Sequence, residues 1–71
     1  MLNKDKFRSA IIERGDRQED AASAIGISPQ ALSQVLNGRR DFRRNEIELL
    51  ALHYRLTMED IRSIFFTELS N

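Results

Sequence analysis

Apolar residues recur at helical spacing in two neighbouring stretches near the middle of this 71-residue chain. In each stretch they lie on one side of the helix that the spacing predicts, and polar residues occupy the other side. These apolar residues are Ala21, Ala22, Ile25, Leu32, Val35 and Leu36. The pattern therefore predicts two short helices in succession between Gln18 and Gly38.

The residues between and after these stretches favour a tight turn and a defined end. Gly26 adopts a positive φ without strain, so the first helix of the pair should stop there. Ser28 can accept a hydrogen bond from a free amide of the next helix, and Pro29 suits the first position of that helix. Asn37 and Gly38 have the form of a glycine C-cap. The stretch is thus expected to form a helix, a turn and a second helix.

The outer side of the second predicted helix carries short, uncharged polar side chains. They are Gln30, Ser33, Gln34 and Asn37. A Gln or Asn amide offers one donor and one acceptor, which match N6 and N7 of adenine in the major groove of DNA. An ordinary solvated helix can carry the same residues, so the helix alone leaves both interpretations open. The turn at Gly26, the small Ala22 and the arginines that follow favour base reading.

This stretch resembles the helix-turn-helix of the phage repressor and Cro family, also called the XRE-like family of bacterial regulators. The matching residues are Gln18, Ala22, Gly26, Ile27, Leu32, Val35, Asn37 and Gly38. The resemblance extends loosely from Phe7 to about Phe66. It implies an all-α, lambda-repressor-like fold, a compact bundle of about five helices whose third helix enters the major groove.

The chain departs from the family pattern at three positions. Ala21 stands where the family usually has Leu, which should thin the core. Arg17 replaces the usual Thr cap before Gln18. Pro29 stands where many members place a base-reading side chain, so direct readout should rest more heavily on Gln30 and Gln34.

Further helices are expected on both sides of this pair. A first helix should be capped by Asn3 and run through Glu13 or Arg14. A fourth helix should begin at Asn45. Three pairs of residues have the spacing of a capping box at predicted helix starts. The pairs are Asp16 with Glu19 for the second helix, Asn45 with Glu48 for the fourth, and Thr57 with Asp60 for the fifth.

The fifth predicted helix, which should extend to about Leu69, is rich in large apolar residues. They are Ile61, Ile64, Phe65, Phe66 and Leu69. These side chains exceed what one short helix needs to dock. Two explanations stay open, a core within one protomer and a homodimer contact through this helix.

Length and composition restrict the class of protein. A chain of 71 residues has room for one domain, spanning 1–71, with one small core. The absence of Cys removes disulfides and thiolate metal sites, and it fits a reducing cytoplasm. The sequence has no apolar run typical of a signal peptide or a membrane span. We expect a soluble protein of the bacterial cytoplasm or nucleoid.

Charge is uneven along the chain although its formal net value is zero. Residues 39–44, RRDFRR, carry four Arg against one Asp, whereas residues 45–71 carry two Arg against five acidic side chains. The positive excess follows the predicted reading helix, where a DNA backbone would pass, although a solvated loop is the alternative. Phe42 is expected to plug the core, because one aromatic lacks the repeated pattern of a single-strand platform.

These patterns assign candidate DNA contacts of two kinds. Base-reading residues are Gln30, Gln34 and Ser33. Backbone-holding residues are Gln18, Ser28, Asn37, Arg39, Arg40, Arg43 and Arg44. Gln18 is included because the N-terminus of a helix favours anions such as a phosphate, although simple exposure is an equal alternative.

Catalytic chemistry is not indicated. His53 is the only histidine and has no second His or Cys for a metal. The adjacent acidic pairs, at 19–20 and 59–60, point in different directions on their helices. We therefore expect no enzymatic activity, no metal, no cofactor and no small-molecule substrate.

Two functions are compatible with the sequence. The leading hypothesis is a sequence-specific regulator that binds a double-stranded DNA operator, acting as a Cro-like repressor by occupying the operator. The alternative is a helix-turn-helix module used for protein contacts, antitoxin-like or anti-repressor.

Overall fold

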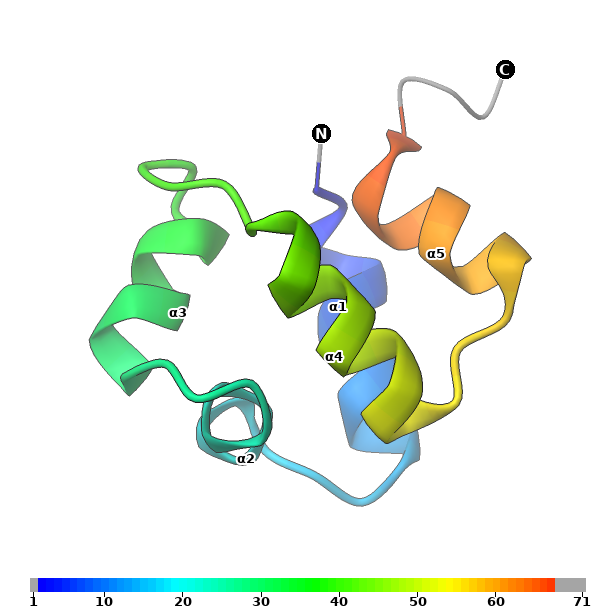
Figure 1. Ribbon diagram of the computed structural model, residues 1–71, viewed down its shortest axis with the longest axis horizontal. Helices are drawn as coiled ribbons and strands as arrows, with labels where there is room; N and C mark the ends of the chain where they lie inside the picture. The colour runs from blue at the N-terminus through cyan, green and yellow to red at the C-terminus, as the bar shows by residue number, and fades with distance from the viewer. Residues whose placement is uncertain (1, 68–71) are drawn as a thin grey trace.

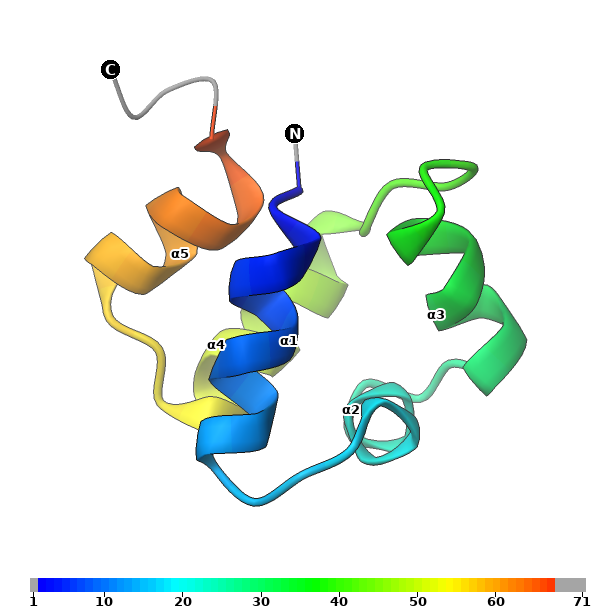
Figure 2. The same cartoon turned by 180° about the vertical axis from the view of Figure 1, so that it is seen from behind.

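The computed structural model describes residues 2–67, and these form five helices and no strand. The helices are α1 (Lys4–Glu13), α2 (Gln18–Ala24), α3 (Pro29–Leu36), α4 (Arg44–Tyr54) and α5 (Met58–Phe65). The prediction of an all-α bundle of about five helices is confirmed. Figure 1 shows α3 and α5 at opposite ends of the molecule, with α1 and α4 between them. The view from behind shows α1 in front of α4 (Figure 2).

The core forms where the apolar stripes of all five helices meet. Its members are Phe7, Ile11, Ala21, Ala22, Ile25, Leu32, Val35, Leu36, Leu50, Tyr54, Ile64 and Phe65. Phe42, from the loop between α3 and α4, packs against this core, with its ring centroid 5.6 Å from those of Phe7 and Phe65. The expectation that Phe42 is a plug is confirmed. This loop is therefore anchored at its centre.

Helix α2 packs against α1, α3 and α4. Its residues Ala21 and Ala22 are completely buried. Their small side chains let the neighbouring helices approach closely, so α3 is held against the body of the protein by a short, tight contact. Ala21, which departs from the family pattern, is therefore part of the packing that supports α3.

Several helix ends form as the sequence predicts. Asn3 caps α1, because its Oδ1 accepts a hydrogen bond from the Lys6 amide at 3.1 Å. The Thr57 hydroxyl accepts from the Asp60 amide at 3.0 Å, and the Asp60 carboxylate accepts from the Thr57 amide at 2.9 Å. This reciprocal pair is a capping box. The hydrogen bond from the Thr57 amide to the Asp60 carboxylate, followed by a side-chain hydrogen bond from Thr57, lowers the pKa of Asp60 below its ordinary value.

Two of the predicted capping pairs are wrong. The cap of α2 is Arg17, whose amide donates to the Asp20 carboxylate at 2.8 Å, and Asp16 instead accepts a hydrogen bond from the Tyr54 hydroxyl at 2.7 Å. The cap of α4 is Arg43, one residue before the helix, and its amide donates to Glu46. In both places a different acidic residue has the correct spacing from the actual helix start, and the sequence pattern did not distinguish them.

The fifth helix ends at Phe65, earlier than expected, and Leu69 lies outside the described residues. Ile64 and Phe65 are buried in the core of the protomer itself, and Ile61 packs against it. These residues therefore belong to the monomer core, and among the described residues near this helix end Phe66 is the more exposed apolar side chain. Within residues 2–67, no helix has the length and apolar character needed to cross a lipid bilayer.

Candidate nucleic-acid interface

The outer face of α3 is an uninterrupted polar strip. It consists of Gln30, Ser33, Gln34 and Asn37, at i, i+3, i+4 and i+7, and all four are exposed. The strip is exposed because Leu32, Val35 and Leu36 take the opposite side of the helix into the core. Helix α3 also lies at one end of the molecule, where no other helix covers it (Figure 1).

The first turn of α3 is fixed by its own side chains. The Ser28 hydroxyl accepts a hydrogen bond from the Ala31 amide at 3.0 Å, and Pro29 occupies the first helical position. Ser28 thus uses its oxygen to cap the helix while its hydroxyl proton stays available to a phosphate. Both predictions for this helix start are confirmed.

The last turn of α3 brings Asn37 and Ser33 together. The Asn37 Nδ2 donates to Ser33 Oγ at 3.5 Å, a long hydrogen bond on the exposed side of the helix. Gly38 then adopts φ +78°, which turns the chain out of the helix. The turn places the loop of residues 39–43 directly after the polar strip.

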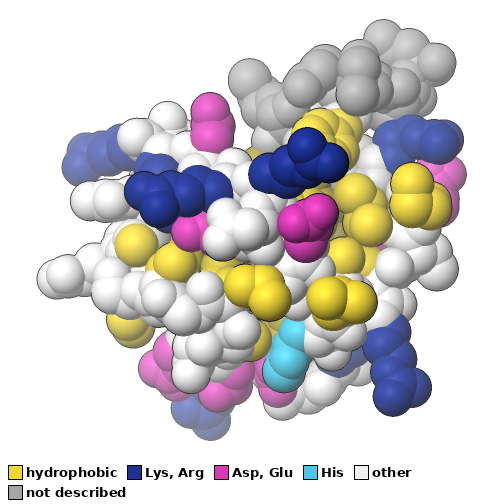
Figure 3. Space-filling model, viewed as in Figure 1, with side chains coloured by type: hydrophobic (Ala, Val, Ile, Leu, Met, Phe, Trp, Pro, Cys, Tyr) yellow, Lys and Arg dark blue, Asp and Glu magenta, His cyan; other side chains and the backbone are white. Residues whose placement is uncertain are grey.

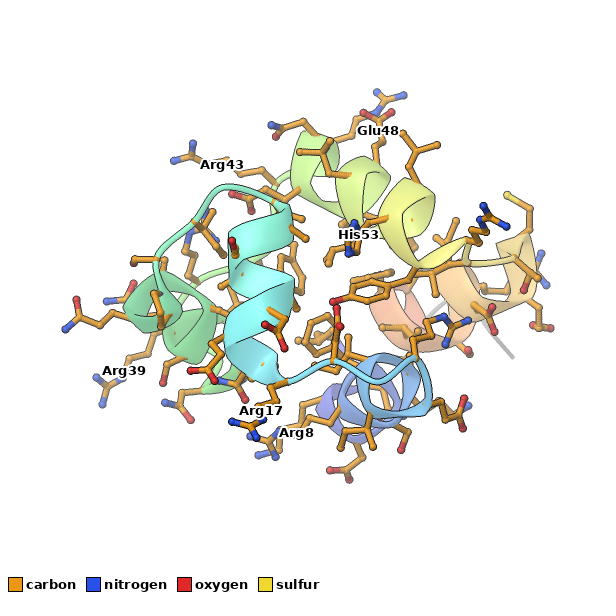
Figure 4. All side chains as sticks on the ribbon, turned by 90° about the horizontal axis from the view of Figure 1, so that it is seen from below. Arg8, Arg17, Arg39, Arg43, Glu48 and His53 are labelled. Atoms are coloured by element: carbon orange, nitrogen blue, oxygen red, sulfur yellow. The ribbon has the colours of Figure 1, made fainter. Side chains whose placement is uncertain are left out.

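Arg39 and Arg43 are exposed on this loop. In Figure 4 both project away from the body of the protein at the end that carries α3. Figure 3 shows Lys and Arg side chains at the upper left, over the region of this loop, with acidic side chains among them and further acidic side chains lower down, over the region of α2. The cations therefore border the polar strip, as the sequence predicts.

Arg40 differs from the expectation for a backbone-holding residue. Its Nη2 donates to Glu46 Oε2 at 2.7 Å, and Glu46 is only 4% exposed. Arg40 is itself half-buried, so it cannot present its whole guanidinium to a duplex while this pair holds. The loop thus has an inward arginine between outward ones.

Glu46 connects the loop to α4. Its Oε1 accepts from the Arg43 amide at 2.9 Å, while Oε2 accepts from Arg40. Burial raises the pKa of Glu46, but the hydrogen bonds and charges of Arg40 and Arg43 outweigh it, so the pKa lies below its ordinary value. Sequence reasoning missed this residue. The available signal was a Glu three residues after the residue that precedes a helix, which is the spacing of a capping box.

Arg44 extends along α4. Its Nε lies 3.9 Å from Glu48 Oε2, one helical turn further on, and both side chains are exposed. Such a pair contributes little and leaves the guanidinium accessible.

Comparison with known protein families matches residues 7–61 to the helix-turn-helix family HTH_3. The chain belongs to this XRE- and Cro-type family. Membership of HTH_3 implies DNA binding, and no catalytic family is found. Neither the comparison with curated proteins nor the comparison with solved structures finds a match.

In this HTH_3 domain Gln18 is the first residue of α2 and is half-buried. Its neighbour Arg17 is highly exposed and lies 3.8 Å from Glu19. In Figure 4 Arg17 and Arg8 project from the same edge of the molecule, beside the start of α2. The sequence pattern identifies Arg17 only as a replacement for the usual cap and does not indicate that its charge is exposed next to Gln18.

The C-terminal end of α4 is tied to the turn between α1 and α2. Tyr54 donates its hydroxyl to Asp16, and Arg14 Nε donates to the Tyr54 carbonyl at 2.8 Å. His53 Nε2 lies 3.9 Å from the same Asp16 carboxylate. Burial, followed by the hydrogen bond to Asp16, raises the pKa of Tyr54. These contacts fix the HTH_3 scaffold behind α3.

Among the described residues, no group of three or more His, Cys, Asp or Glu side chains is placed to hold a metal ion.

Proposed function

We propose that this HTH_3 protein is a sequence-specific regulator that binds a double-stranded DNA operator and represses by occupying it, in the manner of Cro-like proteins. The observation that carries the proposal is the exposed amide strip on α3, with Arg39 and Arg43 at its C-terminal end. A duplex placed against α3 would receive the amides of the strip in its groove, and the arginine side chains would lie at its phosphates. In this proposal residues 1–71 form one domain, and the protein acts in the bacterial cytoplasm or nucleoid.

The proposed base readers are Gln30 and Gln34, with Ser33 between them. Their amides lie on the outermost side of α3 and have no partner within residues 2–67 that would have to be displaced. Each bidentate amide to an adenine edge discriminates against other bases by about 1–3 kcal/mol.

The proposed phosphate contacts surround α3. Those with exposed side chains are Ser28, Asn37, Arg39, Arg43 and Arg44, and Gln18 is half-buried. Arg40 contributes by holding the loop in place through Glu46. An operator read by two copies would present half-sites about one helical turn, roughly 34 Å, apart.

The test is a selection of bound sequences from a random duplex pool. The native protein should enrich a defined site, whereas Gln30→Ala and Gln34→Ala should each relax preference at one base pair. Asn45→Ala is the matched control, because Asn45 is an exposed amide on α4. If both glutamine variants select the same site as the native protein, the assignment of the reading face is wrong.

The exposed Glu19 beside the start of α2 favours a second candidate, a module that contacts proteins instead of DNA. The zero net charge is compatible with it. Titration against random duplex at low salt separates the two functions. Binding that weakens steeply as salt is added supports the regulator, and no binding at any salt concentration supports the protein-contact module.

A further inference from the structure

The last residue of the polar strip on α3, Asn37, is followed directly by Gly38. The other two described asparagines, Asn3 and Asn45, are each followed by a charged residue with a long side chain. Gly38 has no Cβ, so no side chain crowds its backbone nitrogen and the chain rotates freely around it. The Asn37 side chain is therefore the one most open to attack by the backbone nitrogen that follows it.

The reaction that this pair of residues can undergo is deamidation. The Gly38 backbone nitrogen attacks the side-chain carbonyl carbon of Asn37, and the new C–N bond closes a succinimide ring. The proton of the Gly38 amide moves to the departing amide group, which leaves as ammonia. Water then opens the ring at either carbonyl and gives aspartate or isoaspartate. The net reaction converts one amide and one water to one carboxylate and one ammonium ion, without oxidation or reduction.

The folded structure exposes the amide that would be lost but turns the attacking nitrogen away from it. The Asn37 side chain is exposed, and its Nδ2 donates only the long hydrogen bond to Ser33 Oγ within residues 2–67. The ψ angle of Asn37 is 4°, which places the Gly38 nitrogen beside the backbone nitrogen of Asn37 and not beside its side chain. Ring closure therefore requires rotation about this ψ angle.

Two hydrogen bonds resist that rotation. The Gly38 amide donates to the Val35 carbonyl at 3.1 Å, and the Arg39 amide donates to the Gln34 carbonyl at 2.9 Å. Together they form a Schellman motif, which ends α3. Local opening costs the least free energy at such helix ends. The reactive geometry is thus reached only during brief opening of the last turn of α3.

We propose that Asn37 is a deamidation site, that opening of the Schellman motif at the end of α3 sets its rate, and that the carboxylate formed weakens binding to DNA. The last part rests on the proposed function. Asn37 is one of the proposed phosphate contacts, beside the exposed Arg39. A carboxylate at this position removes the amide donor and places a negative charge against the phosphates of a duplex.

Mass spectrometry of peptides from the aged full chain, without DNA, tests the modification. After incubation of the folded protein in mildly alkaline buffer, Asn37 should be converted about tenfold or more faster than Asn3 and Asn45, because only Asn37 precedes a residue without a Cβ. Conversion of Asn37 no faster than that of Asn3 and Asn45 overturns the proposed site.

The same measurement on the unfolded chain tests the role of the helix end. In guanidinium chloride Asn37 should be converted roughly tenfold faster than in the folded protein, because the two hydrogen bonds of the Schellman motif are lost. Equal rates in the folded and unfolded chains overturn the control by this motif.

The aged protein also tests the effect on binding to random duplex at low salt. The native protein should lose affinity in proportion to the fraction converted, whereas Asn37→Gln should keep its affinity on ageing, because the longer side chain closes a ring much more slowly. Equal losses for the two proteins overturn the functional part of the inference.

A freshly prepared Asn37→Asp variant should reproduce the loss and bind about tenfold or more weakly than the native protein, because its carboxylate lies against the phosphates. Met58→Glu is the matched control for added charge. Met58 is 75% exposed at the start of α5, at the other end of the molecule from α3. This variant should change affinity less than twofold, and equal effects of the two variants overturn the functional part. Thermal unfolding verifies that both variants are folded.

The outcomes separate this inference from the proposed function. A protein that selects an operator but retains its Asn37 amide on ageing keeps the proposed function and loses this inference. A protein that deamidates at Asn37 but binds no duplex when fresh keeps the modification site and loses the proposed function.

Discussion

The outer faces of α3 and α4 are both exposed, but they carry different chemistry. The face of α3 holds short amides and a hydroxyl without charge, and the outer face of α4 holds Leu49 and Leu52 between Glu48 and Arg55. Amides match the donors and acceptors of base edges, whereas leucine side chains lower the free energy of a contact only because they leave water. Of these two faces, only that of α3 therefore carries groups that match the base edges of a duplex.

The largest expected effect comes from substituting Glu46, the α4 residue that holds the loop between these faces. Glu46→Ala removes the partner of Arg40 and the acceptor for the Arg43 amide, and it leaves a half-buried cation unpaired. We expect a loss of roughly 3 kcal/mol in the free energy of unfolding, measured by urea denaturation. Glu48→Ala, which removes an exposed carboxylate of the same helix, should cost less than about 0.5 kcal/mol. Equal losses would contradict the structural role of Glu46.

Alanine at the centre of each face sharpens the comparison itself. Gln34→Ala should cost about 1–3 kcal/mol of binding to the preferred site and relax one base pair. Leu52→Ala should leave both the binding to that site and the selected sequence unchanged, because Leu52 lies on the outer face of α4. Competition binding with single-base operator variants measures the first effect. If Leu52→Ala changed base preference as much as Gln34→Ala, the two faces would not have separate roles.

The cations beside α3 should act on all sequences alike. Arg39→Ala should weaken binding to specific and random duplex equally and reduce the slope of log affinity against log salt by about 1. Arg62→Ala is the control, because Arg62 is exposed on α5, at the other end of the molecule. Its salt slope should match that of the native protein. A reduced slope for both variants would show that position on the molecule does not matter.

Acidification should weaken the fold. The pKa values of Glu46 and Asp60 are lowered in the folded protein, so their contribution to stability is present above the ordinary pKa of these carboxyls. That contribution is lost as the pH falls through the lower, folded-state values. Urea denaturation from pH 7 to pH 3 should show this loss. The Glu46→Gln variant should show a smaller decline, because it has one fewer shifted carboxylate.

The helix-turn-helix was predictable because its signals are local. These signals are Gly26, Ser28, Pro29 and Gly38. Each acts on the backbone within a few residues, and each has the turn or cap position that the sequence predicts. Hydrophobic spacing also identified the buried side of α3. These signals do not depend on the rest of the fold.

The errors arose where a choice depends on distant contacts. Asp16 has the spacing of a cap, but its carboxylate binds Tyr54, which lies 38 residues away. In RRDFRR no periodicity tells which arginine turns inward. Arg40 does so because Phe42 anchors the loop in the core and Glu46 lies beneath it. Tertiary packing determines which residue forms each contact, and a local sequence pattern carries no information about that packing.

Helix α3 has only eight residues, too few to persist in water without the rest of the protein. Its two ends are nevertheless set by Ser28 and Gly38, and its inner side is locked into the core. A duplex would therefore meet a reading element that is already rigid. Little conformational entropy is lost on association, and differences between DNA sequences should appear mainly in how long each complex survives.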